Sequence, residues 1–145
     1  MAYTTDADLM AIRPQILQLG VESWDQYHTD AATTVDEVLE VRWYRGEADQ
    51  RGFNYTTTPF DGDLLDTTQI KKLVAYKVLE LCYEYLMKEM SEADGFERFM
   101  KLYNKRYENE LQRLLALGLH YDWDEVDTVD QDEKFAQQYR RLARS

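Results

Sequence analysis

The sequence predicts a mainly α-helical fold, a small helical bundle built on an antiparallel hairpin of long helices. Apolar residues recur at spacings of three and four over residues 67–90 and again over 95–117, with a link of about four residues between them. The helical period is lost over about 45–65, which indicates an inserted loop or β-arm. The expected domains are a helical domain, residues 1–118, and an extended acidic C-terminal arm with a short terminal helix, residues 119–145.

The N-terminal part is expected to form short helical segments followed by one long helix. Thr5 is placed to cap a helix over about residues 6–12, and Pro14 then breaks it because proline lacks the N–H that a helix interior needs. A Ser-Trp-Asp-Gln sequence beginning at Ser23 has the spacing of a capping box. The apolar spacing after it predicts a helix over Trp24–Tyr44, about 30 Å long.

Residues 45–65 leave two interpretations open. Residues 53–58 are of types that favour strands, so the segment is predicted to form either an arm or a small hairpin. Such an arm would offer Phe53 and Tyr55 to another subunit, and both are candidate interface residues. The alternative is a flexible loop, because the segment is interrupted by Gly46, Gly52, Pro59 and Gly62.

The two helices of the hairpin have clear boundaries. Asp66 and Gln69 form a second capping pair, and Gly118 is placed to stop the second helix. One face of the first helix is expected to contain Ile70, Leu73, Val74, Lys77, Val78, Leu81, Cys82, Tyr85, Leu86 and Met90. The matching face of the second contains Phe96, Phe99, Met100, Tyr103, Tyr107, Leu111, Leu114 and Leu115. Because the link is short, these faces must pack antiparallel.

The first half of the C-terminal arm, residues 120–133, carries much of the net charge of −11. Residues 120–133 contain seven acids and no Lys or Arg, which leaves 17 basic against 21 acidic residues elsewhere. Blocks of like charge usually stay solvated or act as interaction tails. Aromatic residues alternate with the acids at Tyr121 and Trp123, a pattern typical of an extended arm with one face on protein. The candidate inter-subunit or partner contacts in the arm are Leu119, Tyr121, Asp122, Trp123, Asp124 and Asp127.

The composition excludes several classes of function. An acidic chain lacks the clustered Lys and Arg that grip nucleic-acid phosphates. No apolar run approaches the roughly 20 residues that span a bilayer, and the N-terminus does not resemble a signal peptide. The lone Cys82 excludes an internal disulfide. We therefore expect cytoplasmic synthesis and no membrane contact.

The searches for catalytic and metal-binding motifs also argue against an enzyme. An EF-hand loop starting at Asp122 would need glycine at its sixth position, where Asp127 stands, so a solvated or partner-facing arm is preferred to a calcium site. His28 and His120 have no second ligand at metal spacing, and we expect both at a surface or interface. No phosphate-binding loop or nucleophile elbow is present. The expectation is no catalytic residue, no cofactor and no metal.

The order of elements resembles that of tailed-phage head-tail adaptor (connector) proteins, of the head-completion family. The similarity is carried by the start Tyr3-Thr-Thr-Asp-Ala-Asp-Leu-Met-Ala-Ile-Arg-Pro14, a long helix ending Val41-Arg-Trp-Tyr44, the central hairpin, and Arg106-Tyr-Glu-Asn-Glu-Leu111 leading to Gly118-Leu-His-Tyr-Asp-Trp-Asp124. It covers most of residues 3–127, apart from the insertion at 44–66.

The resemblance implies a structural virion protein rather than an enzyme. Such proteins form a ring, usually of twelve copies, that binds beneath the portal protein at the capsid vertex. The ring joins the portal to a tail-proximal neck or stopper protein, and DNA passes through it without specific binding. The expected location is the virion neck, at the head-tail junction. The alternative is an acidic inhibitory or DNA-mimicking binding protein, whose carboxylates would be spaced like phosphates over one face.

Overall fold

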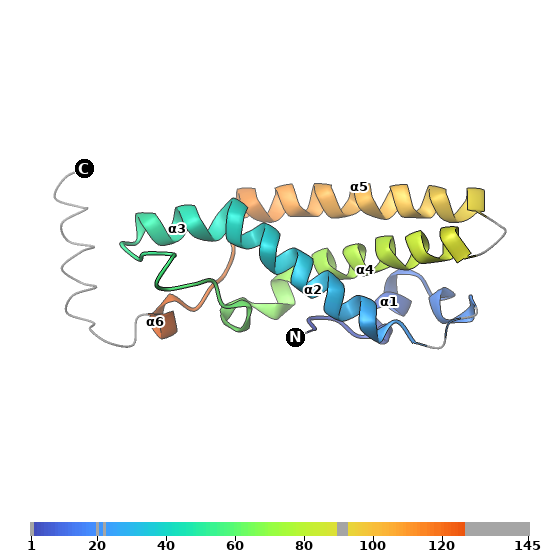
Figure 1. Cartoon of the computed structure of the whole chain (residues 1–145), viewed down its shortest axis with the longest axis horizontal. Helices are drawn as coiled ribbons and strands as arrows, with labels where there is room; N and C mark the ends of the chain where they lie inside the picture. The colour runs from blue at the N-terminus through green and yellow to red at the C-terminus, as the bar shows by residue number, and fades with distance from the viewer. Residues whose placement is uncertain (1, 20, 22, 90–92, 127–145) are drawn as a thin grey trace. The chain divides into compact units, whose positions relative to one another are not determined.

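The computed structural model describes residues 2–19, 21, 23–89 and 93–126, and this part of the chain is mainly helical (Figure 1). The expected terminal helix of the arm, Met90 and Asp127 lie outside the described residues. The elements are α1 (Asp6–Ile12), η1 (Ile16–Gln18), α2 (Asp25–Leu39), η2 (Glu40–Tyr44), α3 (Arg45–Gln50), η3 (Gly62–Leu64), α4 (Thr67–Glu89), α5 (Ala93–Leu117) and α6 (Trp123–Val126). They form two compact units, which are described separately below.

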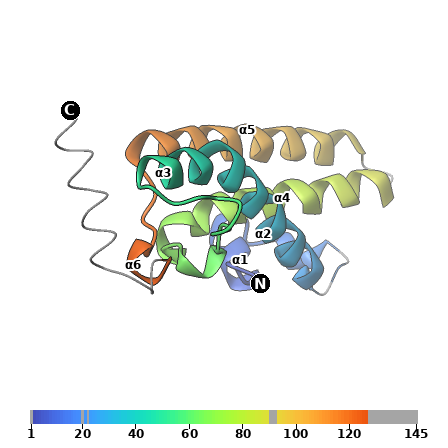
Figure 2. The same cartoon turned by 60° about the vertical axis from the view of Figure 1, so that its left-hand side comes forward.

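Unit 1 comprises residues 1–35 and 67–119 and is built on α4 and α5. These helices run side by side and antiparallel in both ribbon views (Figures 1 and 2), so the predicted hairpin is present. α5 ends at Leu117, followed by Gly118 with φ +91°. Side chains with a Cβ rarely adopt this left-handed conformation, which explains why the helix stops at a glycine.

The core of unit 1 shows that α4 buries more than the single face predicted for it. Leu79 and Tyr83 are almost fully buried, whereas Leu81 is half-buried and Tyr85 is exposed. Tyr83 stacks on Tyr103 of α5 at 5.8 Å between ring centroids. α4 also contacts α1 in addition to α5, and a helix covered on several sides carries apolar residues around most of its circumference.

The short helix α1 has the predicted bounds and the predicted start. Its capping box is formed by Thr5 and Asp8, with the Thr5 backbone N–H donating to Asp8 Oδ2 at 2.8 Å. Leu9 is the buried residue of this helix, and its solvent exposure is 0%. The cap and the burial of Leu9 therefore both stabilise this short helix.

The expectation of a surface position is wrong for His28, which is 2% exposed. Its Nδ1 lies 2.7 Å from Thr4 Oγ1, and its Nε2 lies 2.8 Å from Asp6 Oδ1. A hydroxyl, an imidazole and a carboxylate in this order resemble a nucleophilic triad. However, Thr4 is itself only 4% exposed, so its hydroxyl has no access to a substrate. The contacts instead tie the N-terminal segment to α2. His120, by contrast, has a side chain that is 75% exposed.

Cys82 is fully buried in α4, and burial raises the pKa of its thiol. Because the thiolate is the reactive form, we predict that the native protein resists alkylation by a thiol reagent. Addition of denaturant should release one reactive thiol per chain, measured by mass spectrometry. Rapid labelling without denaturant would contradict this burial.

Unit 2 contains residues 36–66 and, within the described chain, 120–126. The predicted long helix does not end at Tyr44: it passes through the π-helical segment η2 and continues as α3 to Gln50. The expectation that residues 45–50 belong to the insertion is therefore wrong. A glycine such as Gly46 costs a helix only about 1 kcal/mol, and burial of Tyr44 and Ala48 offsets that cost.

The remainder of the insertion forms a loop, and the β-arm is not confirmed. Residues 51–66 contain no strand and one isolated antiparallel bridge, from Leu65 to Tyr121. The strand-favouring threonines lie in a turn set by Asn54, whose Oδ1 accepts from the Thr56 N–H at 3.0 Å. An Asn side chain that bonds the backbone two residues on stabilises a turn and competes with strand pairing.

Candidate interaction surface

The predicted interface segment is held in unit 2 by backbone hydrogen bonds on both sides of Tyr121. The Asp66 N–H donates to the His120 carbonyl at 3.0 Å, and the Asp122 N–H donates to the Leu64 carbonyl at 2.9 Å. These bonds flank the bridge between Leu65 and Tyr121. Residues 120–122 are therefore paired with the segment that precedes α4.

Aromatic side chains then hold the segment in place, and we call the following set the aromatic cluster: Trp43, Tyr44, Phe53, Phe60, Tyr121 and Trp123. Trp123 stacks with two rings, at centroid distances of 5.7 Å to Tyr44 and 5.6 Å to Phe53. The Arg51 guanidinium lies 4.6 Å from the Trp123 ring centroid. Trp43 contacts both Tyr121 and Trp123. The six rings form a small core from two segments far apart in sequence.

The predicted interface residues therefore divide into two groups. Leu119, Tyr121 and Trp123 are 7–9% exposed, so these three predicted contacts are buried within their own chain. These aromatic side chains are occupied within their own chain, which leaves them little surface for a neighbouring copy. Phe53 is half-buried in the same cluster.

The second group remains accessible. Asp122 and Asp124 are exposed, and Tyr55 is 40% exposed with the Arg45 guanidinium 5.3 Å from its ring centroid.

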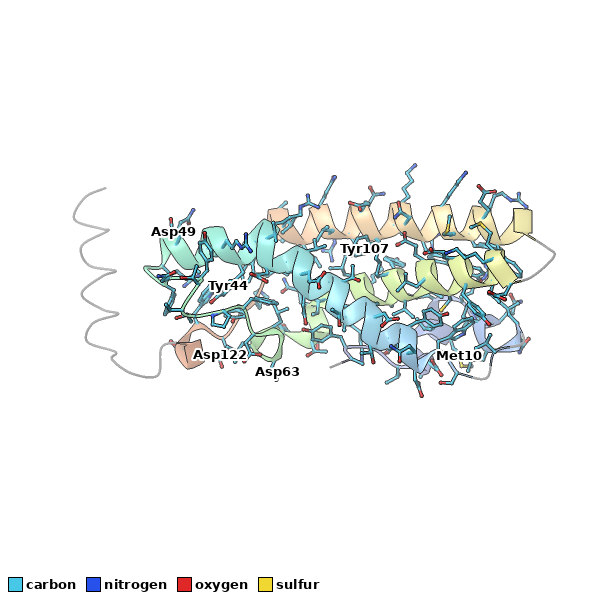
Figure 3. The ribbon with its side chains drawn as sticks, viewed as in Figure 1. Met10, Tyr44, Asp49, Asp63, Tyr107 and Asp122 are labelled. Carbon is cyan, nitrogen blue, oxygen red and sulfur yellow. The ribbon has the colours of Figure 1, made fainter. Side chains whose placement is uncertain are left out.

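The accessible acids extend over more of unit 2 than predicted. A shallow depression of about 450 Å³ is lined by Asp63, Asp66, Asp122, His120, Leu64, Leu65 and Tyr121. Figure 3 shows Asp63 and Asp122 side by side on this part of unit 2. Sequence reasoning missed Asp63 and Asp66, because only the pairing of Leu65 with Tyr121 brings them beside Asp122.

The phenol groups beneath the acids are uncharged at neutral pH. Burial raises the pKa of Tyr121 to about 12, although a hydrogen bond from the Asp61 backbone N–H partly opposes the shift. Burial also raises the pKa of Tyr44, whose hydroxyl donates to the Thr58 carbonyl at 2.6 Å. The aromatic cluster therefore adds no charge of its own, and the acids determine the electrostatics of this surface.

Unit 1 carries a groove of the opposite sign between α4 and α5, which we call the basic groove. It has a volume of about 280 Å³ and is lined by Lys72, Tyr76, Arg106, Asn109, Glu110 and Arg113. Glu110 is 7% exposed and is held by Arg113, whose Nε donates to Glu110 Oε1 at 2.5 Å. Its carboxylate is thus turned inward while the cations line the opening.

The described residues give no sign of a metal centre or a membrane span. They contain no group of three or more His, Cys, Asp or Glu side chains placed to hold a metal ion. None of their helices combines the length and the apolar content needed to cross a bilayer.

Comparisons with known families, characterised proteins and solved structures found no match to this chain.

Proposed function

We propose that this protein is a structural adaptor of a tailed phage, in which a ring of copies joins the portal at the capsid vertex to the tail. The observation that carries the proposal is how the acidic arm begins. Tyr121 and Trp123 fix the start of the arm in the aromatic cluster, and the acids of residues 122–133 follow directly. An anchored, highly charged segment is suited to contact with another protein.

The charge of the protein supports a role as a channel for DNA. The net charge of −11 repels the phosphate backbone, so a ring of such chains lets the duplex slide through its lumen. A basic lumen would instead hold the duplex. The proposed partners are further copies of this chain, the portal protein and a tail-proximal neck or stopper protein, and the proposed location is the virion neck after synthesis in the host cytoplasm.

One observation favours a second candidate, an acidic binding protein that imitates DNA. Asp63, Asp66 and Asp122 gather on one depression, as the carboxylates of a mimic would. A mimic needs carboxylates spaced like phosphates over a whole face. Here the acids are concentrated in one segment, residues 120–133, in which half of the 14 residues are acidic. The two functions separate experimentally, because a mimic competes with DNA for a DNA-binding protein and an adaptor does not.

The adaptor proposal predicts that truncation after Val126 abolishes binding to portal rings. This truncation retains every described residue, so the helical hairpin and the aromatic cluster should stay folded, which a cooperative melting transition checks. Binding is measured by co-sedimentation of the purified protein with portal rings of the same phage. Truncated protein that sediments with portals as well as the full chain does would show that residues 127–145 are dispensable for portal binding.

A neutralised full-length variant serves as the matched control. It carries Asp127→Asn, Asp130→Asn, Asp132→Asn and Glu133→Gln, which keeps the full length of the chain and neutralises the four acids that the truncation removes. If charge carries the contact, this variant should bind as weakly as the truncated protein. Binding of the full chain should also weaken with added salt, because salt screens exposed charges.

A further inference from the structure

The basic groove is formed by one stripe of side chains from each helix of the hairpin. Lys72 and Tyr76 are four residues apart on α4, and Arg106 and Arg113 are seven residues apart on α5. Residues at these spacings share a helix face. Tyr76 contributes a flat wall and stacks with Tyr103 at 6.3 Å between ring centroids.

The groove is positive although the protein is strongly acidic. Its lining holds three cationic side chains and one carboxylate, Glu110, which is already paired with Arg113. Lys72 and Arg106 are both exposed, and the ion pairs among the described residues include neither. By contrast, the neighbouring Lys71 lies 3.5 Å from Asp8. Two cations at the opening are therefore available to an anionic ligand.

The acidic arm supplies the matching chemistry within the same sequence. Residues 120–133 carry seven carboxylates and no Lys or Arg. Arginine binds carboxylates through two parallel hydrogen bonds, and lysine binds them as a point charge, so both cation types of the groove suit such a segment. A long duplex is the poorer fit, because strong binding to DNA requires many more cations than the three present here.

We infer that the basic groove of one copy receives the acidic arm of a second copy. Each chain then carries both halves of a head-to-tail contact, and contacts of this kind close into a ring when the rotation between copies allows it. The inference rests on the proposed ring and names the surface through which its copies meet. It is separable from the portal role, because self-association is measured without portal protein.

A charge-swap experiment on the full-length chain tests this contact. The groove variant carries Lys72→Glu with Arg106→Glu, and the arm variant carries Asp130→Lys with Asp132→Lys. Sedimentation velocity at low salt should show that the wild type self-associates and that each variant does so roughly tenfold more weakly or worse. A control with Arg98→Glu and Lys105→Glu changes the charge by the same amount on exposed residues of α5 outside the groove, and should associate like the wild type.

Mixing the two variants identifies the contact as one between copies. In the mixture, the acidic groove of the groove variant meets the basic arm of the arm variant. The native groove of the arm variant meets the native arm of the groove variant. The mixture should therefore regain association that neither variant shows alone. The inference is overturned if the wild type is monomeric, if the control weakens association as much as the groove variant does, or if mixing restores nothing. Binding of a DNA fragment by the wild type, lost in the groove variant while self-association is unchanged, would assign the groove to phosphates instead.

Portal binding distinguishes this inference from the adaptor function. A groove variant that loses self-association but still sediments with preassembled portal rings would support the groove contact and leave the portal role intact. A wild type that self-associates through the groove but does not bind portals would contradict the proposed function alone.

Discussion

Leu79→Asp is expected to unfold the helical hairpin. Leu79 has 0% exposure in α4, so the substitution places an unpaired carboxylate in the core of unit 1. Such a group costs several kcal/mol, a large part of the 5–15 kcal/mol that stabilises a typical domain. The purified variant should show much less helical circular dichroism at 25 °C than the wild type, or should be recovered only as insoluble protein.

Leu81→Asp is the matched control for this prediction. It makes the same chemical change two residues along α4, at a side chain that is only half-buried. Its carboxylate reaches water more easily, so the loss of stability should be clearly smaller. Equal melting temperatures for the two variants would show that Leu79 is no more deeply buried than Leu81.

Trp123→Ala is expected to have the second largest effect, a loss of about 3–5 kcal/mol from the stability of unit 2. The indole packs against Tyr44, Phe53 and Tyr121, and the Arg51 guanidinium lies over its ring. Its removal leaves a cavity that these rings cannot easily fill. Near-ultraviolet circular dichroism and urea denaturation monitor the cluster directly.

Asp122→Ala is the control for Trp123→Ala, because it alters an exposed side chain in the adjacent position. Its stability should stay within about 0.5 kcal/mol of the wild type. If Trp123→Ala were equally mild, the aromatic cluster would not be a core. Comparing the two variants also decides how an assembly defect is interpreted. A defect in Trp123→Ala follows from disruption of the aromatic cluster and not from a lost contact with a partner.

Local rules predicted the ends of several helices correctly. The capping box at Thr5 and the glycine stop at Gly118 depend on residues within one helical turn, so the sequence itself contains the information. Apolar spacing likewise identified the hairpin. The same spacing missed Leu79 and Tyr83, because a single-face pattern does not describe a helix that packs on α1 as well as α5.

The features that sequence reasoning missed depend on contacts between distant residues. His28 lies in the core because Thr4 and Asp6, more than 20 residues away, satisfy both of its ring nitrogens. Tyr121 and Trp123 were assigned to a partner because nothing in the local sequence shows that Tyr44 and Phe53 receive them. The basic groove was missed for a similar reason, since its cations come from two helices.

The most direct measurement for the adaptor function is electron microscopy of portal rings incubated with and without the purified full-length protein. The adaptor function predicts an additional ring of density, coaxial with the portal and at its outer end, that is absent when the protein is truncated after Val126. Portals that look the same with and without the protein, at concentrations where the protein is soluble and folded, would contradict the adaptor function.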